Sequence, residues 1–256
     1  MTAQIELAKA FHRLHVKGDP VVLFNVWDAG SARAVANAGA TAIATGSWSV
    51  AAAHGREDGQ ALSLALALEN LARIVASVSL PVTIDIEAGY GDAPDIVGET
   101  VVRSIACGAI GINLEDQVIG GEGLYTLSDQ SLRIAAARHA ADHAQMPVFI
   151  NARTDIFLQA DAGQHGDQLG NDALRRALAY AEAGASGFFV PGLADEKLIA
   201  RLCEACPLPV NIMVMSHTPS AKRLAELGVA RISHGPGPYR LAMRTLEDEA
   251  RRIYAA

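Results

Sequence analysis

One unit recurs along the chain and constrains its fold more than any other feature. Each copy consists of a helix end, a glycine, a small residue and a short apolar run that ends in a polar or glycine-rich loop. The copies are NAGATAIATG (37–46), ACGAIGINLED (106–116), EAGASGFFVPG (182–192) and ELGVARISHG (226–235). A glycine after the last helical turn is a usual helix stop, and the apolar run that follows is typical of a buried parallel strand.

The repeated unit gives four strands, an apolar run near the start of the chain gives another, and three more follow a proline. Together they predict eight strands, at residues 21–26, 41–46, 82–87, 110–115, 148–152, 187–191, 210–214 and 230–233. Helical segments such as 31–38 and 172–183 separate them. This alternation predicts an α/β fold, a single (β/α)8 barrel of TIM type over residues 1–256, with a C-terminal helix at about 236–254.

A doubly wound open sheet is the alternative fold. Its first strand-to-helix turn usually carries a G-x-G-x-x-G motif, which NVWDAGSA lacks. The connections 47–62 and 116–128 are long and polar, and we expect them to be loops at the functional site.

Composition excludes several classes of partner. The net charge is −7 and no lysine- or arginine-rich block occurs, so we expect no nucleic-acid binding. No uninterrupted apolar run approaches 18 residues, so we expect no membrane span. Three cysteines are a low, odd number that favours a reducing, cytoplasmic location. Cys203 and Cys206 form a lone C-x-x-C, which we expect near a helix end rather than on zinc.

Three carboxylates end two neighbouring strands of the predicted barrel. Asp85 and Glu87 end the third strand and Glu115 ends the fourth, at the rim where barrel enzymes carry their sites. Three partly buried carboxylates need a proton or a cation to offset their repulsion. An all-oxygen set favours Mg²⁺ or Mn²⁺. The alternative is that some of them are capping or surface anions.

Arg153 ends the fifth strand and is the natural complement of these acids. Its guanidinium is suited to grip a substrate carboxylate with two hydrogen bonds. The alternative is a structural ion pair with Asp155 or Glu115.

Four motifs together resemble the isocitrate lyase/phosphoenolpyruvate mutase superfamily. They are TGSWSVAAAHGREDG (45–59), VTIDIEAGYGD (82–92), GINLED (111–116) and NARTD (151–155). The resemblance spans nearly the whole chain. It implies an α/β barrel, dependence on Mg²⁺ and a small 2-oxo or 2-hydroxy acid as substrate. It also implies homo-oligomers, dimers or commonly tetramers, whose subunits exchange the C-terminal helix.

The resemblance also implies roles for individual residues. Asp85 is then the direct metal ligand, and Glu87 and Glu115 hold metal-bound waters. Asp58 matches the acidic residue of the loop after the second strand, and Arg153 matches the substrate-binding arginine.

The substrate carboxylate would lie against the second strand end. Gly46, Ser47 and Trp48 match the segment whose backbone N–H groups receive it, and Asn211 matches a polar position on the seventh strand.

Two departures from the superfamily bear on the reaction. Isocitrate and methylisocitrate lyases carry a K-[KR]-C-G-H loop after the fourth strand, where this chain has QVIGGEGLYTL (117–127). They also carry a glutamate where this chain has Gly192. A tricarboxylate lyase is therefore disfavoured, and the chain resembles a short bacterial branch near oxaloacetate decarboxylase-like proteins.

These observations favour a Mg²⁺-dependent lyase that cleaves a C–C bond next to the 2-oxo or 2-hydroxy carbon of a small acid through a pyruvate-type enolate. Tyr125, Glu122 and water are the candidate proton donors. One alternative is a C–P mutase or hydrolase acting on phosphonopyruvate or phosphoenolpyruvate. A second is a barrel that binds 2-oxo acids without turnover. A weaker one is a phosphate site at SHGPGP (233–238).

Overall fold

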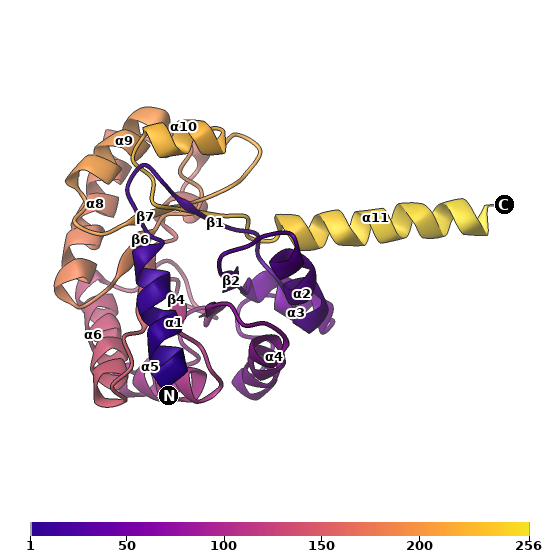
Figure 1. The fold of residues 1–256 in the computed structure, drawn as a ribbon. Coiled ribbons are helices and arrows are strands. Elements are labelled where there is room, and N and C mark those ends of the chain that lie inside the picture. Colours follow the sequence, from indigo (N-terminus) through magenta and orange to yellow (C-terminus); the bar gives the residue numbers. More distant parts are fainter. Residues whose placement is uncertain (1, 256) are drawn as a thin grey trace.

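The protein is a nearly closed barrel of eight parallel strands surrounded by helices (Figure 1). The computed structural model describes residues 2–255. The strands pair in the order β1-β8-β7-β6-β5-β4-β3-β2, and a parallel bridge between Val26 and Thr45 joins the two outer strands. The strands are β1 (Val21–Leu23), β2 (Ile43–Ala44), β3 (Val82–Asp85), β4 (Gly111–Glu115), β5 (Phe149–Arg153), β6 (Gly187–Phe189), β7 (Val210–Met213) and β8 (Arg231–Ser233). The predicted (β/α)8 barrel is confirmed.

The helices follow the strands in regular alternation. They are α1 (Thr2–Arg13), α2 (Ala29–Asn37), α3 (Ser47–Ala53), α4 (Leu64–Ser77), α5 (Pro94–Ala106), α6 (Leu127–His143), α7 (Ile156–Gln159), a 3₁₀ turn η1 (Ala162–Gln164), α8 (Asp167–Glu182), α9 (Glu196–Ala205), α10 (Ala221–Glu226) and α11 (Gly237–Tyr254). Capping side chains fix several helix starts. For example, Asp28 accepts a hydrogen bond from the N–H of Ser31 at the start of α2.

Strand register places the site residues on one rim. Asp85 of β3 pairs with Asn113 of β4, and Glu115 of β4 pairs with Arg153 of β5. At the opposite end of the barrel, the buried ring of Phe11 on α1 packs edge-on against Phe149, 5.4 Å between centroids. Helix α1 therefore covers part of the amino-terminal end of the barrel, opposite the rim that carries the site residues.

One of the two predicted loops is partly helical. Residues 47–53 form α3, whose Val50 and Ala51 are buried, and the segment that follows it is irregular. The segment SWSVAAA contains enough apolar residues to pack a helix against the rim of the barrel. Its two serines made it look like part of a polar loop. The loop after β4 is confirmed, because β4 ends at Glu115 and α6 begins at Leu127.

The C-terminal helix α11 projects away from the barrel (Figure 1). Within its described residues only Pro238 is buried, while Leu241, Leu246 and Ile253 are each more than half exposed. The predicted helix is confirmed, and its exchange between subunits stays a prediction. No helix within residues 2–255 has both the length and the apolar character needed to span a bilayer.

The C-x-x-C pair lies at a helix end, as predicted. Cys203 is in the last turns of α9 and Cys206 caps it, and both thiols are free and buried. The ammonium of Lys17 donates to the carbonyls of both residues. Burial raises the pKa of the Cys203 thiol to about 12, so this pair is structural.

Candidate active site

A cavity of about 160 Å³ opens at the carboxyl ends of the strands. Its polar lining is formed by Asn25, Gly46, Ser47, Asp58, Asp85, Asn113, Arg153 and Ser233. Its remaining lining is formed by Trp48, Leu158, Phe189, Met213, Gly235 and Pro236. The structure thus brings together six of the predicted site residues, namely Gly46, Ser47, Trp48, Asp58, Asp85 and Arg153.

Asp85 is held firmly at the end of β3. Its carboxylate accepts hydrogen bonds from the backbone N–H of Ser47 at the start of α3 (3.2 Å) and from that of Glu87 (3.2 Å). Its own N–H donates to the hydroxyl of Thr45 on the adjacent strand (3.0 Å). Both neighbouring segments therefore fix the direction in which this carboxylate faces.

Glu87 connects the metal-site motif to the loop that carries Asp58. Its backbone has φ of +51°, and its carboxylate accepts a hydrogen bond from the N–H of Gln60. Burial, followed by the charges of Asp85 and Asp58, raises the pKa of Glu87 to about 7. Burial and then Asp85 raise the pKa of Asp58 as well.

Arg153 forms the ion pairs that were the alternative to substrate binding. Its guanidinium lies 2.7 Å from the carboxylate of Glu115 and holds Asp155 with two hydrogen bonds, of 2.5 and 2.8 Å. Burial opposes its charge, but the carboxylates of Glu115 and Asp155 outweigh burial and raise its pKa. Arg153 still lines the cavity, so one guanidinium both balances the acids and faces the space for a ligand.

The metal roles predicted for Asp85, Glu87 and Glu115 stay predictions, and the structure shows how these side chains lie against protein partners. Among the described residues, no three His, Cys, Asp or Glu side chains lie close enough to surround a metal. Glu115 is turned to Arg153 and Glu87 to Gln60, so neither lines the cavity beside Asp85. Burial nevertheless raises the pKa of Glu115, with Arg153 opposing the shift and Asp155 and Asp85 adding to it.

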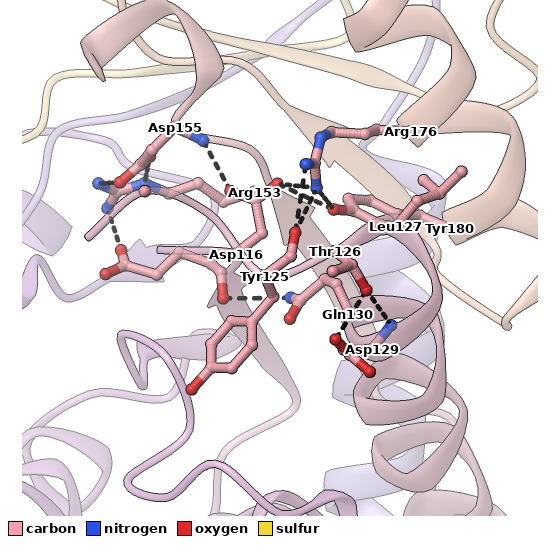
Figure 2. A network of polar contacts seen from close by, with 12 residues as sticks. Asp116, Tyr125, Thr126, Leu127, Asp129, Gln130, Arg153, Asp155, Arg176 and Tyr180 are labelled. Atoms are coloured by element: carbon pink, nitrogen blue, oxygen red, sulfur yellow. Dashed lines mark hydrogen bonds and ion pairs between the residues drawn. The ribbon is translucent and has the colours of Figure 1, made fainter. Parts of the chain in front are cut away.

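A buried network beneath Arg153 was not found from sequence (Figure 2). Asp116 is fully buried and accepts hydrogen bonds from Arg176 (2.9 Å), from the hydroxyl of Tyr180 (2.8 Å) and from the N–H of Asp155 (2.9 Å). Because Asp155 in turn holds Arg153, this network positions the cavity's guanidinium. Its only sequence signal was that Asp116 directly follows Glu115 in GINLED.

Tyr125 and Asn211 do not line the cavity. The Tyr125 hydroxyl donates to Asp92 (2.5 Å), and the guanidinium of Arg133 lies 4.1 Å from the centre of its ring. Burial and the bond to Asp92 raise its pKa to about 12. Tyr125 therefore pins the loop after β4 to the loop after β3. Asn211 is fully buried on β7, where its side chain accepts from the hydroxyl of Ser233 (3.1 Å).

The turn at 233–238 already has an acceptor for its amides. The side-chain oxygen of Asn25 accepts hydrogen bonds from the N–H groups of His234 (3.0 Å) and Gly235 (2.9 Å). Asn25 thereby fixes the strand-to-helix turn, and the phosphate site at 233–238 stays an untested alternative.

Comparisons with known proteins agree on a family. The sequence profile of the phosphoenolpyruvate phosphomutase family matches residues 11–254. An uncharacterized protein of Mycobacterium tuberculosis is 37% identical over 245 residues, which cover 95% of this chain and 88% of that protein. The 2-methylisocitrate lyase of Escherichia coli is 29% identical over 219 residues, covering 82% and 71% respectively. A solved structure from Burkholderia cenocepacia, provisionally described as a phosphonomutase, is 53% identical with a TM-score of 0.95, covering 97% of this chain and 99% of that one.

Proposed function

We propose that this chain, which belongs to the phosphoenolpyruvate phosphomutase family within the isocitrate lyase superfamily, is a Mg²⁺-dependent carbon–carbon lyase. From a 2-oxo acid it would break the C3–C4 bond, so that the bonding electrons remain on C3 of a pyruvate-type enolate and C4 departs as carbon dioxide or a carbonyl compound. From a 2-hydroxy acid it would break the C2–C3 bond, so that C2 departs in a 2-oxo acid and the enolate forms on the other fragment. The observation that carries the proposal is the cavity in which Asp58 and Asp85 face Arg153 beside the amides of α3.

The donor set fits a hydrated magnesium ion. After burial, the charges of neighbouring carboxylates raise the pKa of Asp58, Glu87 and Glu115, and a bound cation would relieve this repulsion. Mg²⁺ takes one or two carboxylates directly and keeps several waters, so a cage of three direct ligands is unnecessary. Asp85 would hold the ion, and Glu87 and Glu115 would accept from its waters. Mn²⁺ suits the same oxygens.

The chain's own residues would bind and orient the acid. Arg153 and the segment Gly46–Trp48 line the cavity and would receive the substrate carboxylate, for which the N–H of Ser47 would have to leave its present acceptor, Asp85. Asp58 lies on the same wall as a candidate proton acceptor. When bound, Mg²⁺ supplies stabilisation of the enolate oxygen on the order of several kcal/mol.

Release of pyruvate from a panel of C4–C6 oxo and hydroxy acids tests the proposal. We expect release that depends on Mg²⁺ and is lost in Asp85→Asn. Asp248→Asn is the matched control, because that exposed carboxylate lies on the projecting helix α11. If the folded protein released no pyruvate from any acid of the panel, that result would contradict the lyase proposal. Saturable, Mg²⁺-dependent binding without turnover would instead support a non-catalytic barrel.

The description of the 53% identical neighbour favours a second candidate, a C–P mutase or hydrolase. Its reaction would pass through the same enolate, with a C–P bond broken in place of the C–C bond. Phosphorus NMR of phosphonopyruvate and phosphoenolpyruvate separates the two reactions. New phosphorus signals would favour this candidate, and unchanged spectra would remove it.

The assembled state would be an oligomer, a dimer or tetramer. The exposed Leu241, Leu246 and Ile253 of α11 give that helix an apolar surface which a second copy would cover. Light scattering during gel filtration measures the mass, and a monomer at micromolar concentration would contradict this part of the proposal.

A further inference from the structure

A buried cation lies beneath the cavity. Arg231 is the first residue of β8, one inward-facing step below Ser233, and is 1% exposed. Its guanidinium donates to two neutral groups of the cavity lining, the hydroxyl of Ser233 (3.4 Å) and Oδ1 of Asn113 (3.3 Å), and its Nη1 has no partner among the described residues. Burial lowers the pKa of Arg231 to about 9, with Asp85 opposing, so the group is charged at pH 7. Because a buried charge without an anionic partner is unfavourable, the space above Arg231 favours an oxygen that carries negative charge.

Arg231 also fixes the direction of the Asn113 amide. A guanidinium carries only hydrogen-bond donors, so the amide atom that faces it must be the oxygen. The same Oδ1 accepts a second hydrogen bond from Nδ2 of Asn151 (2.9 Å). With its oxygen held by two donors, Asn113 turns Nδ2 away from them, and no protein acceptor for this atom lies within residues 2–255. Nδ2 is not sealed from solvent either, so it presents an N–H to the cavity that Asn113 lines.

Two other polar side chains of the lining are committed to protein partners. Nδ2 of Asn25 donates to the carbonyl of Thr45 (3.0 Å), and its Oδ1 holds the turn after β8. The hydroxyl of Ser233 donates to Asn211 (3.1 Å). Asn113, by contrast, keeps a donor for a ligand.

Strand register places this donor beside Asp85. Asn113 of β4 pairs with Asp85 of β3, and both residues line the cavity. The proposed function puts the oxygen on C2 of the acid beside Asp85 and its carboxylate against Arg153 and α3. The C2 oxygen is then the ligand atom that the amide of Asn113 reaches, and the inference rests on the proposed function for this placement.

We infer that Asn113 donates a hydrogen bond to the C2 oxygen of the substrate and that the substrate is a 2-oxo acid. When the C3–C4 bond of such an acid breaks, its electrons form the C2–C3 double bond and negative charge moves to the C2 oxygen. C4 departs as carbon dioxide, or as a carbonyl compound after its hydroxyl gives up a proton, and C3 then takes a proton from water. An N–H backed by the buried Arg231 stabilises the charge that develops. In a 2-hydroxy acid the C2 oxygen would instead become a neutral carbonyl oxygen, and the reaction would gain nothing from this donor.

Oxalate and lactate test the contact. Both present a carboxylate, but the oxygens on the second carbon of oxalate share a negative charge, as an enolate oxygen does, whereas lactate has a neutral hydroxyl there. Titration calorimetry in saturating Mg²⁺ measures the affinity of the full-length protein for each acid. We expect Asn113→Leu to weaken oxalate binding about tenfold or more, the scale of a hydrogen bond to a charged acceptor, and lactate binding less than about fivefold.

The outcomes separate the inference from the proposed function. Equal losses for the two acids, or no loss, would overturn the contact with the C2 oxygen and leave the lyase proposal standing. Failure of the unaltered protein to bind either acid would overturn both. In the pyruvate-release assay, turnover of hydroxy acids alone would overturn the choice of a 2-oxo acid.

Asn113→Asp guards against a folding defect, because its carboxylate still accepts from Arg231 and Asn151. We expect it to weaken oxalate binding about a hundredfold, since an anionic oxygen replaces the N–H. Leu158→Asp is the charge-matched control: Leu158 lines the same cavity and is 40% exposed, so this change adds a negative charge without removing the donor. It should weaken oxalate binding less than about tenfold. Equal losses in the two aspartate variants would overturn a direct contact.

Arg231 acts through Asn113 and is therefore a positioning residue. Arg231→Lys keeps a cation beneath the amide, whereas Arg231→Met removes the charge at a similar side-chain length. We expect the ratio of oxalate to lactate affinity to stay within about threefold of its original value in Arg231→Lys and to fall about tenfold in Arg231→Met. A tenfold fall in a folded Arg231→Lys variant, or an unchanged ratio in Arg231→Met, would overturn this role.

Discussion

Replacing Arg176 by methionine tests the buried network that supports Arg153. Arg176 has a side chain 16% exposed and donates to the fully buried carboxylate of Asp116 at 2.9 Å. Methionine keeps most of the side-chain volume but removes the charge. Asp116 would then keep only the hydroxyl of Tyr180 and the N–H of Asp155 as donors.

The part of the cost that comes from stranding the charge of Asp116 has an upper bound, because the carboxylate can take up a proton instead of staying charged in the interior. Protonating an aspartic acid of ordinary pKa 3.8 at pH 7 requires about 4 kcal/mol, at 1.36 kcal/mol per pKa unit. The two remaining donors stabilise the anion and lower the cost. We therefore expect Arg176→Met to reduce the free energy of unfolding by about 3 kcal/mol, within the range for breaking a buried ion pair.

A double-mutant cycle measures the coupling between Arg176 and Asp116, with free energies of unfolding taken from denaturation in guanidinium chloride. Asp116→Asn removes the charge that Arg176→Met strands, so the double variant should be more stable than the sum of the single losses by about 2 kcal/mol. Asp172→Asn removes an exposed partner of Arg175 and is the control, with a loss below about 0.5 kcal/mol. A loss under about 1 kcal/mol for Arg176→Met, or simple additivity in the cycle, would refute the reasoning.

Three other predictions concern separate parts of the barrel. Burial, followed by the charge of Arg231, lowers the pKa of His15 to about 3 in the folded protein. His15 therefore binds a proton near pH 6.5 in the unfolded chain but stays neutral in the folded protein at that pH. Stability should therefore fall below pH 6.5, by about 2 kcal/mol at pH 5, and unfolding curves of His15→Phe should lack this loss. A Cβ on Gly192, whose φ is +89°, would lie 2.9 Å from the backbone of Phe157, so Gly192→Ala should cost about 2 kcal/mol in thermal unfolding, whereas Gly237→Ala meets nothing and should cost little. Saturating Mg²⁺ should raise the melting temperature by about 5–10 °C and have no effect on Asp85→Asn, and an equal shift in both would contradict the metal assignment.

The sequence determined the barrel and the place of its site. Strand periodicity and glycine stops follow from local backbone preferences, which is why all eight strands and the C-terminal helix were predictable near their observed positions. The rim position of Asp85 and Arg153 followed from the same pattern, because the carboxyl ends of parallel strands meet at one edge.

Only the tertiary structure decided how those side chains are used. That Glu115 pairs with Arg153, and that Tyr125 bonds to Asp92 rather than lining the cavity, depends on partners far apart in the chain. Likewise, nothing local to Asp116 indicates that it binds Arg176, 60 residues away. Three of the apolar side chains that line the cavity, those of Leu158, Phe189 and Met213, also come from three separate elements. Alternation along a strand says which residues face inward, but long-range packing alone selects which charges meet and what remains to face a substrate.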